Sequence, residues 1–141
     1  MSRIFWDTNL FICLFEDYGT HSERVAQLRR RMLERGDELV TSTLTVAEVL
    51  TGPLRSGNEI LSQQYEEAMR AAAVVVSFDP ATARLCARLR AKPPKISSPD
   101  AIQLACAASA GVDLFLTNDV RLHALHIDGI HFITSVDRAP L

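Results

Sequence analysis

Short apolar runs alternate with helix-like segments along this chain of 141 residues. Each run is brief and apolar throughout, as in Ile4–Trp6 and Val74–Val76. Such runs are typical of strands buried on both faces, and the intervening helices are the connections that parallel strands require. The other expected strands are residues 39–40, 114–116 and 130–133. The pattern predicts one α/β domain over residues 1–141, with a mostly parallel, five-stranded sheet covered by helices on both faces.

Helices are marked by apolar residues spaced three and four apart and by capping residues at their ends. Gly36 is expected to end the second helix and Gly52-Pro53 the third, while Asp79-Pro80 begins the fifth. The last helix is almost entirely small or apolar up to Ala110, so it is expected to be buried. The expected helices are residues 8–16, 21–35, 43–50, 59–72, 79–91 and 97–110.

Four acidic residues are placed at or inside these apolar segments. Asp7 follows the first strand, Glu48 interrupts an apolar helix, Asp100 opens the alanine-rich helix and Asp119 follows the fourth strand. Carboxylates are rarely buried unless they are paired or bound to a metal, and ligands of parallel sheets bind beyond the carboxyl ends of the strands. The four are therefore expected to converge on a site for a hard divalent cation such as Mg²⁺ or Mn²⁺.

Each of these residues, taken alone, also has an ordinary structural role open to it. Asp7 suits a helix cap, Glu48 a solvated helix face, and Asp119 a turn. Asp100 lies in a first helical turn, where the helix dipole favours an anion. The hypothesis of a shared site depends on the four together.

Composition and charge limit the other classes of protein to which this chain can belong. No apolar stretch approaches the roughly 18 residues that span a membrane, and the N-terminus lacks the long apolar region of a signal peptide, so a cytoplasmic protein is expected. The formal net charge is −2, and setting the four carboxylates aside leaves 13 of the 17 acidic side chains against 15 basic ones. That balance permits a polyanionic substrate. Buried, reduced thiols are expected for the three cysteines, Cys13, Cys86 and Cys106.

The order and contexts of the four acidic residues resemble the motifs of PIN-domain nucleases. These motifs are Asp7-Thr8-Asn9, Glu48 within Thr45–Val49, Asp100-Ala101, and Thr117-Asn118-Asp119. The resemblance covers essentially the whole chain, and chains of this size look most like the VapC-type ribonuclease toxins of toxin–antitoxin pairs. It implies a three-layer α/β/α sandwich and Mg²⁺- or Mn²⁺-dependent cleavage of RNA. The segment Lys95–Pro99, before Asp100, departs from the pattern without an assignable role.

The resemblance also implies roles and partners. The implied catalytic residues and metal ligands are Asp7, Glu48, Asp100 and Asp119. A metal-activated water is then expected to attack phosphorus, with one ion or two bound. Thr8, Asn9 and Thr117 are expected to orient the carboxylates by hydrogen bonding. The implied partners are an RNA substrate, a small cognate antitoxin and a second copy in a homodimer or larger assembly. An RNA-processing nuclease of the same family without a toxin role, and a catalytically inactive α/β interaction domain, are the alternatives.

The remaining charged clusters are less specific. His123 and His126 are three residues apart but lack a third nitrogen or sulfur ligand nearby, so a surface or hydrogen-bonded role is expected for them. The arginines from Arg24 to Arg35, and the pair Arg84 and Arg88, suit either a solvated helix face or a patch for a substrate or partner.

Overall fold

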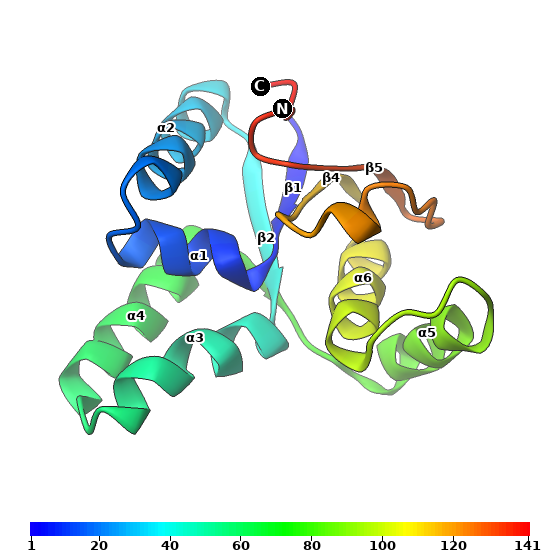
Figure 1. The fold of residues 1–141 in the computed structure, drawn as a ribbon, viewed down its shortest axis with the longest axis horizontal. Coiled ribbons are helices and arrows are strands. Elements are labelled where there is room, and N and C mark those ends of the chain that lie inside the picture. Colours follow the sequence, from blue (N-terminus) through cyan, green and yellow to red (C-terminus); the bar gives the residue numbers. More distant parts are fainter.

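The computed structural model describes residues 1–141 and contains one five-stranded sheet between two layers of helices (Figure 1). The strands lie in the order β3-β2-β1-β4-β5, and all neighbouring pairs are parallel. The predicted five-stranded α/β/α sandwich is confirmed, and its sheet is parallel throughout. The strands are β1 (Arg3–Trp6), β2 (Glu38–Ser42), β3 (Val74–Val76), β4 (Val112–Leu116) and β5 (Ile130–Thr134).

Helices α1 to α4 cover one face of the sheet, and α5 and α6 cover the other (Figure 1). The period-two alternation of a strand divides the core accordingly. Ile4 and Trp6 pack in the cluster beneath α1 to α4, whereas Phe5 packs in the cluster beneath α5 and α6. The helices are α1 (Thr8–Phe15), α2 (Thr20–Arg35), α3 (Thr43–Arg55), α4 (Glu59–Ala72), α5 (Pro80–Ala91), α6 (Ser98–Ala110) and the short 3₁₀ helix η1 (Val120–Leu122).

The strand order reverses between β1 and β4. The chain adds β2 and β3 on one side of β1 and later adds β4 and β5 on the other side. The backbone amide of Asp7 donates to the carbonyl oxygen of Leu116 at 3.1 Å, which ties the carboxyl ends of β1 and β4 together. A parallel sheet opens a crevice at such a reversal, because the connections leave it in opposite directions.

Helix α3 continues through Gly52-Pro53 to Arg55, so the prediction that these two residues end it was wrong. A proline removes one backbone amide from a helix and disturbs the preceding turn. Pro53 lies in the last turn of α3 and its ring is buried, which limits the loss to one hydrogen bond and adds apolar burial in return.

Strand β2 extends past the predicted Val40 to Ser42 because its polar residues find buried partners. The hydroxyl of Thr41 donates to the carbonyl oxygen of Trp6 at 3.0 Å. The three cysteines are free thiols, and Cys86 and Cys106 are buried as predicted. Cys13 is only partly buried, because it lies beside the apolar stripe of α1. No helix has both the length and the apolar composition needed to cross a membrane.

Candidate active site

All four predicted carboxylates line one pocket at the reversal of strand order. Its volume is about 370 Å³. Asp7 follows β1, Asp119 follows β4, and Asp100 and Glu48 lie on α6 and α3. The lining residues are Asp7, Thr8, Asn9, Ile12, Glu48, Pro99, Asp100, Gln103 and Asp119.

The carboxylates surround this pocket without forming a closed cluster. No three His, Cys, Asp or Glu side chains are grouped tightly enough to hold one metal ion. Glu48 accepts a hydrogen bond from the hydroxyl of Thr8 at 2.8 Å. Asp100 accepts one from the hydroxyl of Ser97 at 2.9 Å, which also caps α6. Each carboxylate is thus held by its own local partner.

Asp7 is the most enclosed of the four carboxylates and is held by uncharged donors. Its Oδ1 accepts from the amide of Thr8 at 2.8 Å, and its Oδ2 accepts from the hydroxyl of Thr117 at 2.8 Å. Burial raises the pKa of Asp7, and the negative charge of Asp100 raises it further, although hydrogen bonds from Thr117 and Thr8 act in the opposite direction. A divalent cation held by Asp7 and Asp100 would offset both the burial and the repulsion. Mg²⁺ is usually held by only one or two carboxylates and keeps several waters, so these hard oxygen donors fit Mg²⁺ or Mn²⁺ although no three of them are grouped closely.

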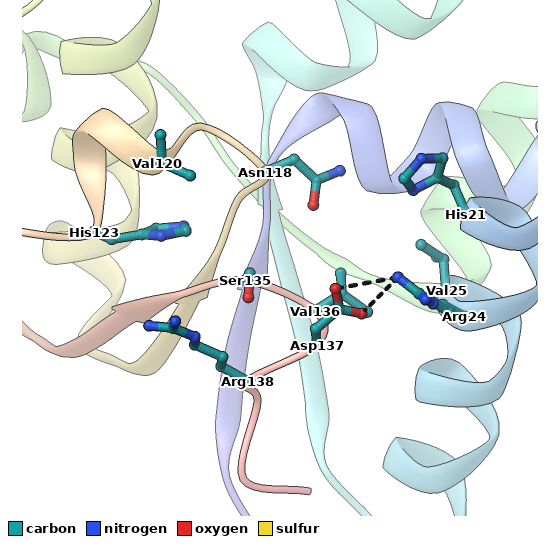
Figure 2. Close-up of a pocket in the computed structure, with 10 residues that line it drawn as sticks. All are labelled: His21, Arg24, Val25, Asn118, Val120, His123, Ser135, Val136, Asp137 and Arg138. Carbon is teal, nitrogen blue, oxygen red and sulfur yellow. Dashed lines mark hydrogen bonds and ion pairs between the residues drawn. The ribbon is translucent and has the colours of Figure 1, made fainter.

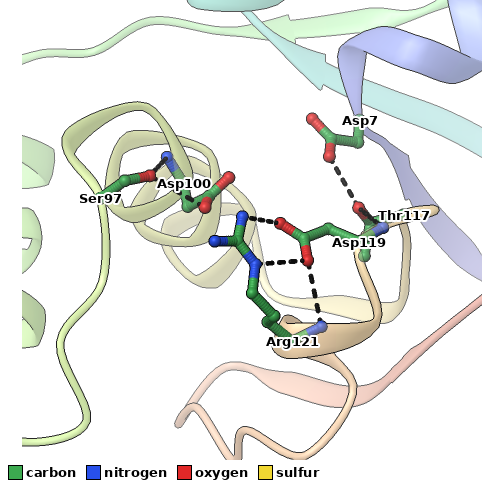
Figure 3. Close-up of polar contacts among 6 residues, drawn as sticks. All are labelled: Asp7, Ser97, Asp100, Thr117, Asp119 and Arg121. Carbon is green, nitrogen blue, oxygen red and sulfur yellow. Dashed lines mark hydrogen bonds and ion pairs between the residues drawn. The ribbon is translucent and has the colours of Figure 1, made fainter.

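Asp119 differs because it already has a cationic partner. Its two oxygens accept from Nε and Nη2 of Arg121 at 3.0 and 2.6 Å. This bidentate pair lowers the pKa of Asp119. Figure 3 shows the Arg121 guanidinium lying between the carboxylates of Asp119 and Asp100. Nothing in the sequence spacing indicated Arg121 as part of the site.

Gln103 joins the site from beneath and was also missed by the sequence analysis. Its side chain is 2% exposed. Its Nε2 lies 2.7 Å from the Thr45 hydroxyl, 3.2 Å from the Thr8 hydroxyl and 3.3 Å from Oδ1 of Asp7. Its Oε1 accepts a hydrogen bond from Ser42. The available signal was one polar side chain in an apolar stretch of α6, three residues after Asp100 and therefore on the same face.

The three residues expected to orient the carboxylates take different positions. Thr8 and Thr117 are buried and donate to Glu48 and Asp7, respectively. Asn9 lines the pocket, but its exposed side chain makes no hydrogen bond. His123 is satisfied by the carbonyl oxygen of Thr117, at 2.9 Å from its Nε2.

Comparison with known proteins gives a family match. Residues 4–127 match the family model of the PIN domain. No curated protein sequence matches the chain significantly.

Several solved structures have the same fold. A DNA-bound VapBC structure from Salmonella typhimurium has a TM-score of 0.71 and 23% identity, over 96% of this chain and 99% of that chain. A toxin–antitoxin complex from Klebsiella pneumoniae has a TM-score of 0.65 and 25% identity, over 90% and 94%. VapC20 from Mycobacterium tuberculosis, a toxin that cleaves the sarcin–ricin loop, has a TM-score of 0.65 and 13% identity, over 87% and 96%. Because the family match spans most of its length, the chain belongs to the PIN domain family.

Proposed function

We propose that this chain is a divalent-metal-dependent endoribonuclease that acts as the toxin of a toxin–antitoxin pair. The observation that carries the proposal is the meeting of Asp7, Glu48, Asp100 and Asp119 around one pocket at the reversal of strand order. Membership of the PIN domain family supports nuclease chemistry. The similar structures support the toxin role and an RNA substrate, since they include VapBC complexes and a toxin that cleaves the sarcin–ricin loop.

In the proposed mechanism, Asp7 and Asp100 would hold the ion, which would offset part of the negative charge of the pocket, and Glu48 and Asp119 would complete the site. A bound Mg²⁺ or Mn²⁺ would supply Lewis acidity at the scissile phosphate and would activate a water for attack on phosphorus. Thr117 and Thr8 fix the orientation of the Asp7 carboxylate through the hydrogen bonds described above.

The paired state of Asp119 leads to a prediction about metal affinity. Arg121→Ala is expected to tighten Mn²⁺ binding about two- to fivefold, the range that an exposed ion pair contributes. The reason is that Asp119 must leave Arg121 before it can bind a metal ion. Titration calorimetry without RNA measures the change. Arg70→Ala, which removes an exposed ion pair with Glu66 on α4, is the matched control. Unchanged or weaker Mn²⁺ binding in Arg121→Ala would exclude this competition.

The proposed partners are a small antitoxin and a second copy of the chain, in the cytoplasm. Ile60 on α4 is 70% exposed, and Tyr65 and Phe15 stack on each other between α4 and α1 while remaining only partly buried. Such apolar side chains suit an antitoxin segment packed against α1 and α4. A basic side chain of that segment would compete with the metal for the acidic pocket.

Cleavage of single-stranded RNA by the purified protein tests the function. Cleavage is expected with Mg²⁺ or Mn²⁺ and is expected to stop in excess chelator. Products are expected to carry 5′-phosphate and 3′-hydroxyl ends, because a water and not the ribose 2′-hydroxyl attacks phosphorus. Cyclic-phosphate ends, or undiminished cleavage in chelator, would contradict the proposal.

A further inference from the structure

A second cavity, here called the basic groove, lies beside the carboxylate pocket. It has a volume of about 580 Å³ and is formed by the start of α2, the turn after β4, η1 and the segment after β5 (Figure 2). Its polar and charged lining residues include His21, Arg24, Asn118, His123, Asp137 and Arg138.

The basic groove and the carboxylate pocket share one turn of the chain. Asn118 lines the basic groove, and the next residue, Asp119, lines the carboxylate pocket. Neighbouring Cα atoms are about 3.8 Å apart, so the two cavities flank the same short turn and lie within reach of one extended ligand. Figure 2 shows Asn118 facing the groove from the end of β4.

The two cavities have opposite charge. Four carboxylates line the pocket and only one of them, Asp119, is paired with a cation, Arg121, whereas the groove holds two arginines against one aspartate. Arg24 is paired with Asp137 at 3.2 Å, but Arg138 forms no ion pair. Asn118 and Ser135 add polar groups whose side chains make no hydrogen bond within the chain.

We infer that the basic groove binds the sugar–phosphate backbone of single-stranded RNA next to the scissile phosphate. Arg138 and Arg24 contact the phosphates of this flanking segment, and Asn118 marks the crossing point from the pocket to the groove. Arginine guanidinium groups suit phosphate oxygens because they donate two parallel, charge-assisted hydrogen bonds. The inference rests on the proposed function, since it assigns part of the same substrate to a second place on the protein.

Removing a positive charge and removing a negative charge from the groove are expected to change the dissociation constant for RNA in opposite directions. Arg138→Ala is expected to raise the dissociation constant for RNA about five- to tenfold, because one phosphate contact is lost. Asp137→Asn is expected to lower the dissociation constant about two- to threefold, because it releases Arg24 and removes the only negative charge. A structural role for either residue would not produce tighter binding.

Fluorescence anisotropy with a labelled, mixed-sequence RNA 12-mer in Ca²⁺, at several salt concentrations, is the experiment. For Arg138→Ala, the slope of log Kd against log salt should fall by about 0.7, the value for one phosphate on a single strand. Steady-state cleavage in Mn²⁺ should show a higher KM for Arg138→Ala with kcat nearly unchanged. Arg138→Lys should restore part of the lost affinity for RNA. Arg55→Ala, an exposed arginine at the end of α3 that lines neither cavity, is the matched control and should leave the dissociation constant unchanged.

Two different experimental outcomes would contradict RNA binding in the groove and the nuclease function. If the wild-type protein neither binds nor cleaves RNA, the proposed function is wrong and the groove inference falls with it. If the wild type cleaves RNA and Arg138→Ala and Asp137→Asn leave both the dissociation constant and the salt slope unchanged, the groove does not bind the substrate while the nuclease function stands.

Discussion

Asp7→Asn is expected to lower metal-dependent RNA cleavage by about a hundred- to a thousandfold, since a catalytic metal contributes several kcal/mol to transition-state stabilisation and each 1.4 kcal/mol is a factor of ten. Asp7 is the carboxylate whose position is fixed most fully, by Thr8, Thr117 and Gln103. Asparagine keeps the size and one acceptor oxygen, so the bonds from Thr8 and Gln103 to Oδ1 can persist while the negative charge is lost. The bond with Thr117 has to reverse, with the asparagine NH₂ donating to the hydroxyl oxygen. Cleavage rates of the purified proteins in Mn²⁺ measure the effect.

The same substitution should not destabilise the metal-free fold at neutral pH. Burial and Asp100 raise the pKa of Asp7 in the folded state above its ordinary value of 3.8. The folded protein therefore holds this proton more tightly than the unfolded chain, and the resulting stability is present below pH 3.8 and is lost as pH rises through the folded pKa. Above that pKa the charged Asp7 destabilises the metal-free protein, and asparagine removes this penalty. Added Mn²⁺ should raise the melting temperature of the wild type more than that of the variant.

Asp128→Asn, an exposed aspartate outside the carboxylate pocket, is the matched control and should behave like the wild type in both assays. In cells, expression of the wild-type chain alone is expected to arrest growth, and Asp7→Asn should not. Cleavage by Asp7→Asn within tenfold of the wild type would remove Asp7 from the mechanism. A nuclease that is active in vitro and harmless in cells would favour the RNA-processing alternative.

Gln103→Leu is expected to lower the free energy of unfolding by about 2–5 kcal/mol, because buried polar groups left without partners cost about 1–3 kcal/mol each. Ser42 and Thr45 are both fully buried and both lie within hydrogen-bond distance of the Gln103 amide. Leucine has nearly the same size, so the loss arises from the hydrogen bonds and not from a cavity. Urea denaturation followed by circular dichroism measures it.

Gln64→Leu on the exposed face of α4 is the control and should change the free energy of unfolding by less than about 0.5 kcal/mol. Cleavage by folded Gln103→Leu should also fall, by about tenfold, since Asp7 and Thr8 lose a shared donor. A Gln103→Leu protein as stable as the wild type would show that the amide network contributes little to the fold.

The sequence by itself determined the order of the elements and the edge at which chemistry can occur. Runs such as Ile4–Trp6 are apolar on both faces, which only a covered parallel strand satisfies, and a residue directly after such a strand must lie at the carboxyl edge of the sheet. The position of Asp7 follows from these local rules. Asp119 follows from the same rules at the end of β4.

Only the tertiary structure decided which side chains meet. The contacts of Gln103 with Ser42, Thr45 and Asp7 join α6 to β2, to α3 and to the end of β1. Their meeting depends on the strand order and on the packing of α6 against β2. The basic groove likewise forms only because the fold places α2 next to the segment after β5, which is more than a hundred residues away along the chain. The physical reason is that periodicity and capping act over one or two turns, whereas hydrogen bonds and ion pairs between elements are set by which strands become neighbours.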